Sequence, residues 1–152
     1  MKKILLISVP TWNEMGHPFK AAVGDIMVFP PMGLLYISSY LKACCDVQVR
    51  LFDFNFARPG SYATADPLLD ELKPDIVCIP ALTNTFYDSL QVARQVKRTL
   101  PSAVVVMGGA HLDLYPRETM THESVDYVVV GEGEEPMRAL VEALEHGDAA
   151  PA

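Results

Sequence analysis

Short hydrophobic runs alternate with longer amphipathic segments along most of this chain. Residues 4–9 and 104–107 are continuous apolar runs, which are typical of strands buried on both faces of a parallel sheet. Residues 47–54 instead alternate apolar and polar side chains, which predicts a strand nearer the edge of the sheet. Two further apolar runs, at residues 74–80 and 127–130, bring the predicted strands to five.

The segments between these runs carry helical signals. Residues 34–42 and 86–100 place apolar side chains at spacings of three and four, as does the last segment, from Met137 to a stop at Gly147. Asp66-Pro67 predicts the start of a helix through residue 72, and a short helical piece is expected around residues 117–121.

Strands that alternate with helices predict an α/β fold with a doubly wound, five-stranded parallel sheet. We expect the flavodoxin-like, Rossmann-like strand order 2-1-3-4-5, in which ligands lodge beyond the carboxyl ends of the strands. One domain is expected over residues 1–147, followed by a frayed tail at residues 148–152.

Charge and composition narrow the partners. The 152 residues include 19 acidic and 12 basic side chains, for a formal net charge of -7, with no basic cluster. Nucleic acid is therefore not an expected partner, because neutralising phosphates supplies most of that affinity. No apolar run reaches the roughly 18 residues of a membrane span, and the apolar run after Met1-Lys2-Lys3 is too short for a signal peptide. We expect a cytoplasmic protein with no membrane partner.

The three cysteines, Cys44, Cys45 and Cys78, form neither a disulfide framework nor a metal-ligand spacing. We therefore expect reduced thiols and no metal ligands.

Four loops follow the predicted strands and should converge on one edge of the sheet. They contain small residues, hydroxyls and glycines, which suits a large and mostly neutral ligand better than a highly charged one. The candidate ligand-binding residues are Thr11, Trp12, Leu82, Thr83, Thr85, Gly108, Gly109, His111, Gly131 and Gly133.

Other ligands of this fold fit the loops poorly. A phosphoryl-receiving regulator needs acidic residues and a lysine where the chain has Pro10, Pro80 and Gly131. A flavin mononucleotide site needs a hydroxyl- and glycine-rich loop after the first strand, and Thr11 alone does not supply it. Gly131-x-Gly133 lacks the third glycine of a dinucleotide motif, because Pro136 stands in its place.

Five motifs occur in the order found in one enzyme family. The chain resembles the amino-terminal cobalamin-binding domain of cobalamin-dependent radical SAM enzymes, which include methylases and the anaerobic magnesium-protoporphyrin ester cyclase. The motifs are Pro30-Pro31-Met32-Gly33-Leu34-Leu35-Tyr36-Ile37, Leu51-Phe52-Asp53, Lys73-Pro74-Asp75-Ile76-Val77, Gly108-Gly109-Ala110-His111, and Val125-Asp126-Tyr127-Val128-Val129-Val130-Gly131-Glu132-Gly133-Glu134.

The resemblance implies that the corrin ring of cobalamin lies across the carboxyl edge and that its dimethylbenzimidazole tail enters a pocket beside the sheet. Leu82, Thr83, Gly108, Gly109 and His111 would then line the tail. Gly131 and Gly133 would let the backbone meet the amide side chains of the corrin.

Two departures from related modules change the expected cobalt coordination. The chain lacks the D-x-H-x-x-G motif whose histidine ligates cobalt, since His17 lies in another context. Pro80 stands where the S-x-L motif has its serine. We therefore expect cobalamin bound with its tail base off the cobalt and no histidine in its place.

The chain has no C-x-x-x-C-x-x-C motif for an iron–sulfur cluster, so we expect no catalysis by this piece alone. The resemblance implies that residues 148–152 begin a linker to a carboxyl-terminal radical SAM domain, where the parent enzyme would hold a [4Fe-4S] cluster and S-adenosylmethionine. Two alternatives remain open: a docking module that has lost cobalamin, and a flavodoxin-like binder of another nucleotide cofactor.

Overall fold

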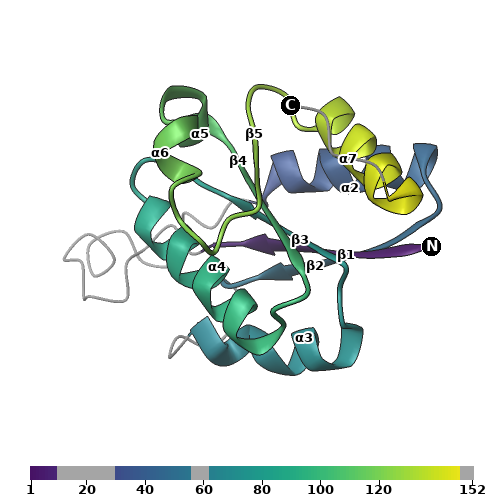
Figure 1. Ribbon diagram of the computed structural model, residues 1–152, viewed down its shortest axis with the longest axis horizontal. Coiled ribbons are helices and arrows are strands. Elements are labelled where there is room, and N and C mark those ends of the chain that lie inside the picture. The colour runs from purple at the N-terminus through teal and green to yellow at the C-terminus, as the bar shows by residue number, and fades with distance from the viewer. Residues whose placement is uncertain (10–29, 56–61, 148–152) are drawn as a thin grey trace.

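The computed structural model describes residues 1–9, 30–55 and 62–147. Five parallel strands form one sheet in the order β2-β1-β3-β4-β5, so the expected fold class is confirmed (Figure 1). The strands are β1 (Lys2–Ser8), β2 (Val47–Asp53), β3 (Ile76–Pro80), β4 (Val104–Gly108) and β5 (Tyr127–Val129). The expected edge strand at residues 47–54 is β2, which pairs with β1 alone.

Helices cover both faces of the sheet (Figure 1). On one face, α2 (Met32–Cys44) and α7 (Glu134–His146) lie side by side and bury Leu34, Leu41 and Met137 against it. On the other, α3 (Asp66–Leu72) and α4 (Phe86–Thr99) bury a larger cluster. Because successive side chains of a strand point to opposite faces of the sheet, each buried strand contributes residues to both hydrophobic clusters.

Short helices connect the remaining elements. A 3₁₀ turn, η2 (Tyr62–Ala65), precedes α3, and two short helices, α5 (Ala110–Leu114) and α6 (Pro116–Thr119), follow β4. The sequence predicted a single helical piece around residues 117–121, which α6 matches to within two residues, but it did not predict α5. The chain turns at Gly109, whose φ of 106° is left-handed, and enters α5 at the next residue.

No helix in the described residues is long and apolar enough to cross a membrane. The last helix ends where the sequence predicted, at Gly147, which adopts the left-handed cap conformation with a φ of 74°. The expected tail at 148–152 lies outside the described residues, as do Thr11, Trp12 and His17.

Candidate functional site

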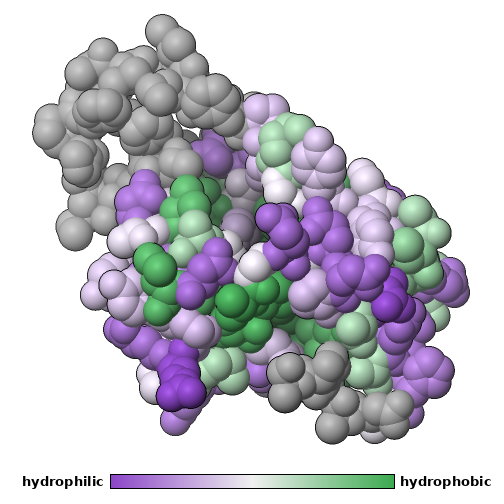
Figure 2. Space-filling model, turned by 90° about the horizontal axis from the view of Figure 1, so that it is seen from above, coloured by the Kyte–Doolittle hydropathy of each residue, from purple (hydrophilic) through white to green (hydrophobic). Residues whose placement is uncertain are grey.

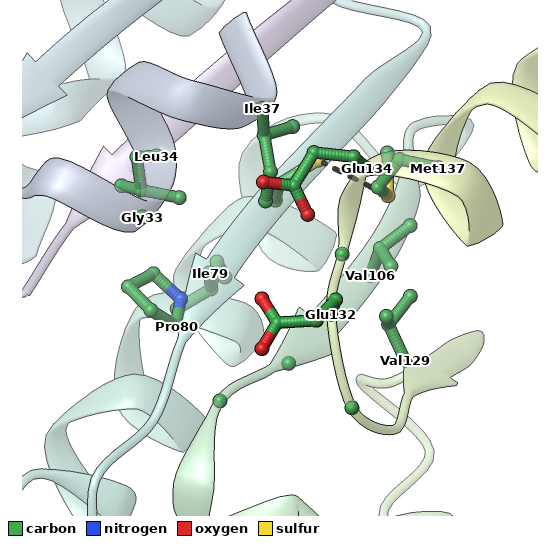
Figure 3. A pocket seen from close by; sticks show the side chains of 15 residues that line it. Gly33, Leu34, Ile37, Ile79, Pro80, Val106, Val129, Glu132, Glu134 and Met137 are labelled. Carbon is green, nitrogen blue, oxygen red and sulfur yellow. Dashed lines mark hydrogen bonds between the residues drawn. The ribbon is translucent and has the colours of Figure 1, made fainter. Parts of the chain in front are cut away.

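A pocket of about 200 Å³ opens at the carboxyl ends of β3, β4 and β5, beneath the first turns of α2 and α7 (Figure 3). The sequence predicted a binding site at this edge of the sheet, and a cavity is present there, on the face that α2 and α7 cover. Its lining residues are Gly33, Leu34, Ile37, Cys78, Ile79, Pro80, Val106, Gly108, Gly109, Val129, Gly131, Glu132, Gly133, Glu134 and Met137.

Two rows of paired residues form the sheet wall of this pocket. Strand register places Gly108 between Pro80 and Val129, and Cys78 beside Val106 in the row behind. Residues two apart on a strand share a face, so Gly108 presents its missing side chain on the same face as buried Val106.

Gly108 leaves room in the pocket, although the fold does not require a glycine at this position. A Cβ built on Gly108 would lie 3.5 Å from the Val129 carbonyl oxygen and 3.6 Å from the Val129 Cβ, which is ordinary contact. Gly33, in the first turn of α2, has no atom within 4 Å of its Cβ position. Glycine is a poor helix and strand former, so neither position uses it to stabilise the fold, and at both it leaves space that a side chain could occupy.

Gly109 has a different role, because the fold demands it. Its φ of 106° disfavours any other residue, and a Cβ there would lie 2.9 Å from the Ala81 carbonyl oxygen. That carbonyl accepts a hydrogen bond from the His111 backbone N–H at 3.2 Å. Gly109 therefore lets the β4–α5 turn close against the loop after β3.

The inner end of the pocket is apolar and uncharged. Cys78, Val106 and Met137 are buried, and the Cys78 Sγ lies 4.0 Å from the Met137 Sδ. Burial raises the pKa of the Cys78 thiol to about 12, so this side chain is neutral at physiological pH. Within the described residues, no group of three or more histidine, cysteine or acidic side chains is arranged to hold a metal ion.

The outer end of the pocket carries its only charged side chains among the described residues. Glu132 is exposed and Glu134 is half-buried. Figure 3 shows Glu132 extending toward Pro80, and Glu134 toward α2. The polarity of the pocket therefore falls from an acidic opening to an apolar floor.

A surface network joins the two helices above the pocket. The Tyr40 hydroxyl of α2 donates to Glu135 of α7, and this bond raises the pKa of Tyr40 to about 12. The same donation, followed by a 2.9 Å bond from the Arg138 Nε, lowers the pKa of Glu135. Arg138 also donates to Glu142, so the network continues along α7.

Part of the predicted set lies on the neighbouring loop and does not line the pocket. Leu82 and Thr83 are exposed after β3, whereas Thr85 is buried with its hydroxyl 3.0 Å from the Leu82 backbone N–H, which donates to it. Thr85 thus shapes this loop.

His111 is held in an aromatic stack. Its ring centroid lies 4.1 Å from that of Phe86 and 5.0 Å from that of Tyr115, and its Nδ1 lies 3.3 Å from the Thr83 Oγ1. Only about 9% of His111 is exposed, so it orients Thr83 more readily than it meets a ligand.

The pocket therefore brings together four of the ten predicted residues: Gly108, Gly109, Gly131 and Gly133. Direct contact of Leu82, Thr83, Thr85 and His111 with a ligand stays a prediction, and Thr11 and Trp12 lie outside the described residues. The pocket residues missed from the sequence come from the helices, as Gly33 and Met137 do, and from the strands, as Cys78, Val106 and Val129 do. A signal existed for Gly33, since glycine is costly in a helix.

Large apolar side chains stay exposed around this edge of the sheet. They include Leu82, Leu114, Tyr115 and Val130, with Met32 at the start of α2. The view from above in Figure 2 shows hydrophobic residues gathered near the middle of the face, with polar residues around them. Exposed apolar side chains at one edge of a domain are a candidate binding face.

Comparison with known proteins identifies the family. A family model described as a B12 binding domain matches residues 26–141. An uncharacterized methyltransferase of Pyrococcus horikoshii is 36% identical over 146 residues, which are 95% of this chain and 30% of that protein. The anaerobic magnesium-protoporphyrin IX monomethyl ester cyclase of Rubrivivax gelatinosus is 32% identical over 120 residues, which are 78% of this chain and 21% of that protein.

The fold is shared with a solved radical enzyme. The radical S-adenosylmethionine methyltransferase TsrM from Kitasatospora setae matches 98% of this chain and 27% of its own, with a TM-score of 0.80 at 18% identity. The chain thus spans less than a third of the length of each of these relatives. Because the family model covers most of the chain, and the motifs and fold agree with it, the chain belongs to the family of B12-binding domains.

Proposed function

We propose that this chain binds cobalamin, with the nucleotide base in the pocket between the sheet and α2/α7 and the corrin ring across the carboxyl edge. The observation that carries the proposal is at Gly108. A side chain there would fit the fold without a clash, yet its absence leaves space in the pocket. Family membership supports the same ligand.

The pocket fits an aromatic base in volume and in polarity. A dry cavity of about 150 Å³ accommodates benzene. A cavity of about 200 Å³ is therefore suited to a substituted bicyclic ring, while the rest of the cofactor must lie outside it. Leu34, Val106 and Met137 offer the apolar contact that such a ring requires.

The opening of the pocket suits the polar part of the nucleotide tail. The first turns of α2 and α7 both line the pocket, and backbone N–H groups at a helix amino terminus have no partner within the helix, so they can donate to oxygen atoms of the tail. The backbone at Gly131 and Gly133, which carries no side chain, can approach the corrin amides.

The residues present support binding with the base off the cobalt. Pro80 lines the pocket and offers no hydroxyl, and none of the described residues that line the pocket is a histidine. When bound, cobalamin supplies a cobalt centre that can carry a methyl group. The residues of this chain only bind the cofactor, orient it and shield its base from water.

The parent protein is proposed to be larger. Its relatives are longer chains, and TsrM has been solved with cobalamin and a [4Fe-4S] cluster bound. We infer that a carboxyl-terminal radical SAM domain, holding that cluster and S-adenosylmethionine, docks on the carboxyl edge. The exposed Leu82, Leu114 and Val130 provide apolar area for this contact.

Retention of colour tests the proposal. The chain is incubated with hydroxocobalamin, passed through gel filtration and measured by visible absorption, and we expect cobalamin to elute with the protein at a 1:1 ratio. After reduction to cob(II)alamin, the electron paramagnetic resonance spectrum should lack the nitrogen superhyperfine splitting of an axial base. A colourless protein refutes binding, and a nitrogen-split spectrum refutes the base-off geometry.

A further inference from the structure

Among the residues that the structure describes, the floor of the pocket offers no N–H or O–H donor on a side chain, only the buried Cys78 thiol. Cys78, Val106 and Met137 form it, and the backbone groups of β3 and β4 behind them pair within the sheet. Neither of the two buried side-chain oxygens that lack a partner in the described residues, Asp53 Oδ2 and Ser124 Oγ, belongs to a pocket residue. The acidic Glu132 and Glu134 stand at the opening instead.

We propose that this pocket selects the lower base of the cofactor by polarity, preferring a benzimidazole over a purine, because Cys78, Val106 and Met137 at its floor leave polar groups of the base without partners. This inference rests on the proposed function, since it concerns the base that enters the same pocket. It names the ligand class more narrowly: benzimidazolyl cobamides rather than adeninyl cobamides.

The chemistry of the two bases explains the preference. Both are bicyclic and differ little in size, and both are joined to the ribose through the five-membered ring, so the six-membered ring reaches furthest from the attachment. In dimethylbenzimidazole that ring carries two methyl groups. In adenine it carries two ring nitrogens and an amino group, which would be buried without partners among Cys78, Val106 and Met137.

The expected effect is moderate. Leaving polar groups unpaired in an apolar site costs about 10- to 100-fold in affinity. One added hydroxyl in the wall recovers part of it, because a net hydrogen bond is worth about 2- to 12-fold.

Val129 allows this to be tested with a matched pair. Val129 lines the pocket and packs against the buried cluster, whereas Val130 is exposed and does not line it. Val129→Thr adds a hydroxyl to the wall at nearly unchanged shape, and Val130→Thr makes the same change outside. Cys78→Ser, with Cys45→Ser as its control on a half-buried thiol outside the pocket, gives a second and independent pair.

The experiment measures the dissociation constants of three reduced probes for the wild-type chain and each variant. The probes are cob(II)alamin, its adenine-containing counterpart, and cob(II)inamide, which has no base. The readout is the ratio of the adeninyl to the benzimidazolyl constant. Comparing this ratio between variants cancels the cost of releasing each base from cobalt, because that cost belongs to the cofactor.

We expect Val129→Thr and Cys78→Ser to lower this ratio by about 2- to 12-fold, and both control variants to leave it unchanged. A ratio that is the same in all five proteins overturns the inference while the proposed function stands. Equal affinity for cob(II)inamide and cob(II)alamin also overturns the inference, because the base then contributes nothing to binding. Failure of every probe to bind refutes the proposed function itself.

Discussion

Replacing Gly108 with alanine should weaken cobalamin binding without weakening the fold. The new methyl group would lie on the pocket face of β4, between Pro80 and Val129. It would occupy on the order of 30 Å³, comparable to a water molecule, in a cavity of about 200 Å³. Overpacking of this kind costs about 1–3 kcal/mol, which corresponds to about 5- to 150-fold weaker binding.

The stability of the Gly108→Ala variant should stay the same or rise slightly. The added Cβ meets the backbone oxygen and Cβ of Val129 at 3.5 and 3.6 Å, so no atom has to move. Glycine in a strand costs about 0.5–1 kcal/mol relative to alanine. The free energy of unfolding in urea should therefore change by no more than about 1 kcal/mol, in the stabilising direction.

Gly147→Ala provides the matched control. Gly147 caps α7 with a φ of 74°, and alanine in that conformation costs about 1–2 kcal/mol of stability. It does not line the pocket, so cobalamin affinity should be unchanged. The two variants together separate binding from folding. The reasoning fails if Gly108→Ala binds cobalamin as tightly as the wild type, or if it loses stability and affinity together.

Three further outcomes follow from the same structure. Gly109→Ala should destabilise the chain by more than 1 kcal/mol in urea unfolding, because its Cβ would lie 2.9 Å from the Ala81 carbonyl oxygen at a left-handed φ; unchanged stability would contradict the close approach. Burial raises the pKa of Cys78 from 9.0 to about 12, so the folded chain holds this proton more tightly than the unfolded chain does. The stability that the protonated Cys78 thiol contributes is fully present below pH 9 and is lost as the pH rises toward 12. The wild type should therefore lose stability relative to Cys78→Val in urea melts between pH 9 and 11, and parallel stability profiles of the two proteins would refute this prediction. Tyr40→Phe removes the hydroxyl that bonds Glu135 across α2 and α7, so fluorescence-monitored binding should show faster cobalamin release; an unchanged off-rate would contradict a role of this bond in holding the two helices together.

Much of the fold could be predicted from local pattern. Apolar runs predicted four of the five strands and an alternating pattern predicted the edge strand β2, while the strand order was expected from the alternation of strands with helices. Helix boundaries were also local, as at Pro67 in the first turn of α3 and Gly147 after α7. The short helix α5 was not predicted, because it begins at a single left-handed residue, Gly109, and five residues are too few to show a helical period.

Much less of the site could be predicted. Contact of His111 and Thr85 with a ligand stays a prediction, and what the structure adds is their surroundings: His111 stacks on Phe86, and Thr85 is buried within the loop after β3. Nothing local distinguishes a histidine that stacks inside from one that faces a ligand, because its surroundings come from distant residues. The same holds for Met137, whose helical spacing indicated a core position and which also forms the floor of the pocket.

The sequence by itself determined that glycine-rich turns meet at one edge of a five-stranded sheet, since strand and turn signals depend on neighbouring residues. Only the tertiary structure decided on which face of that edge a cavity opens. It opens where α2 meets α7, with Tyr40 and Glu135 in contact across 95 positions of the chain. The physical reason is that a buried strand is apolar on both faces, so its own residues do not specify which helices cover each face or where they leave a gap.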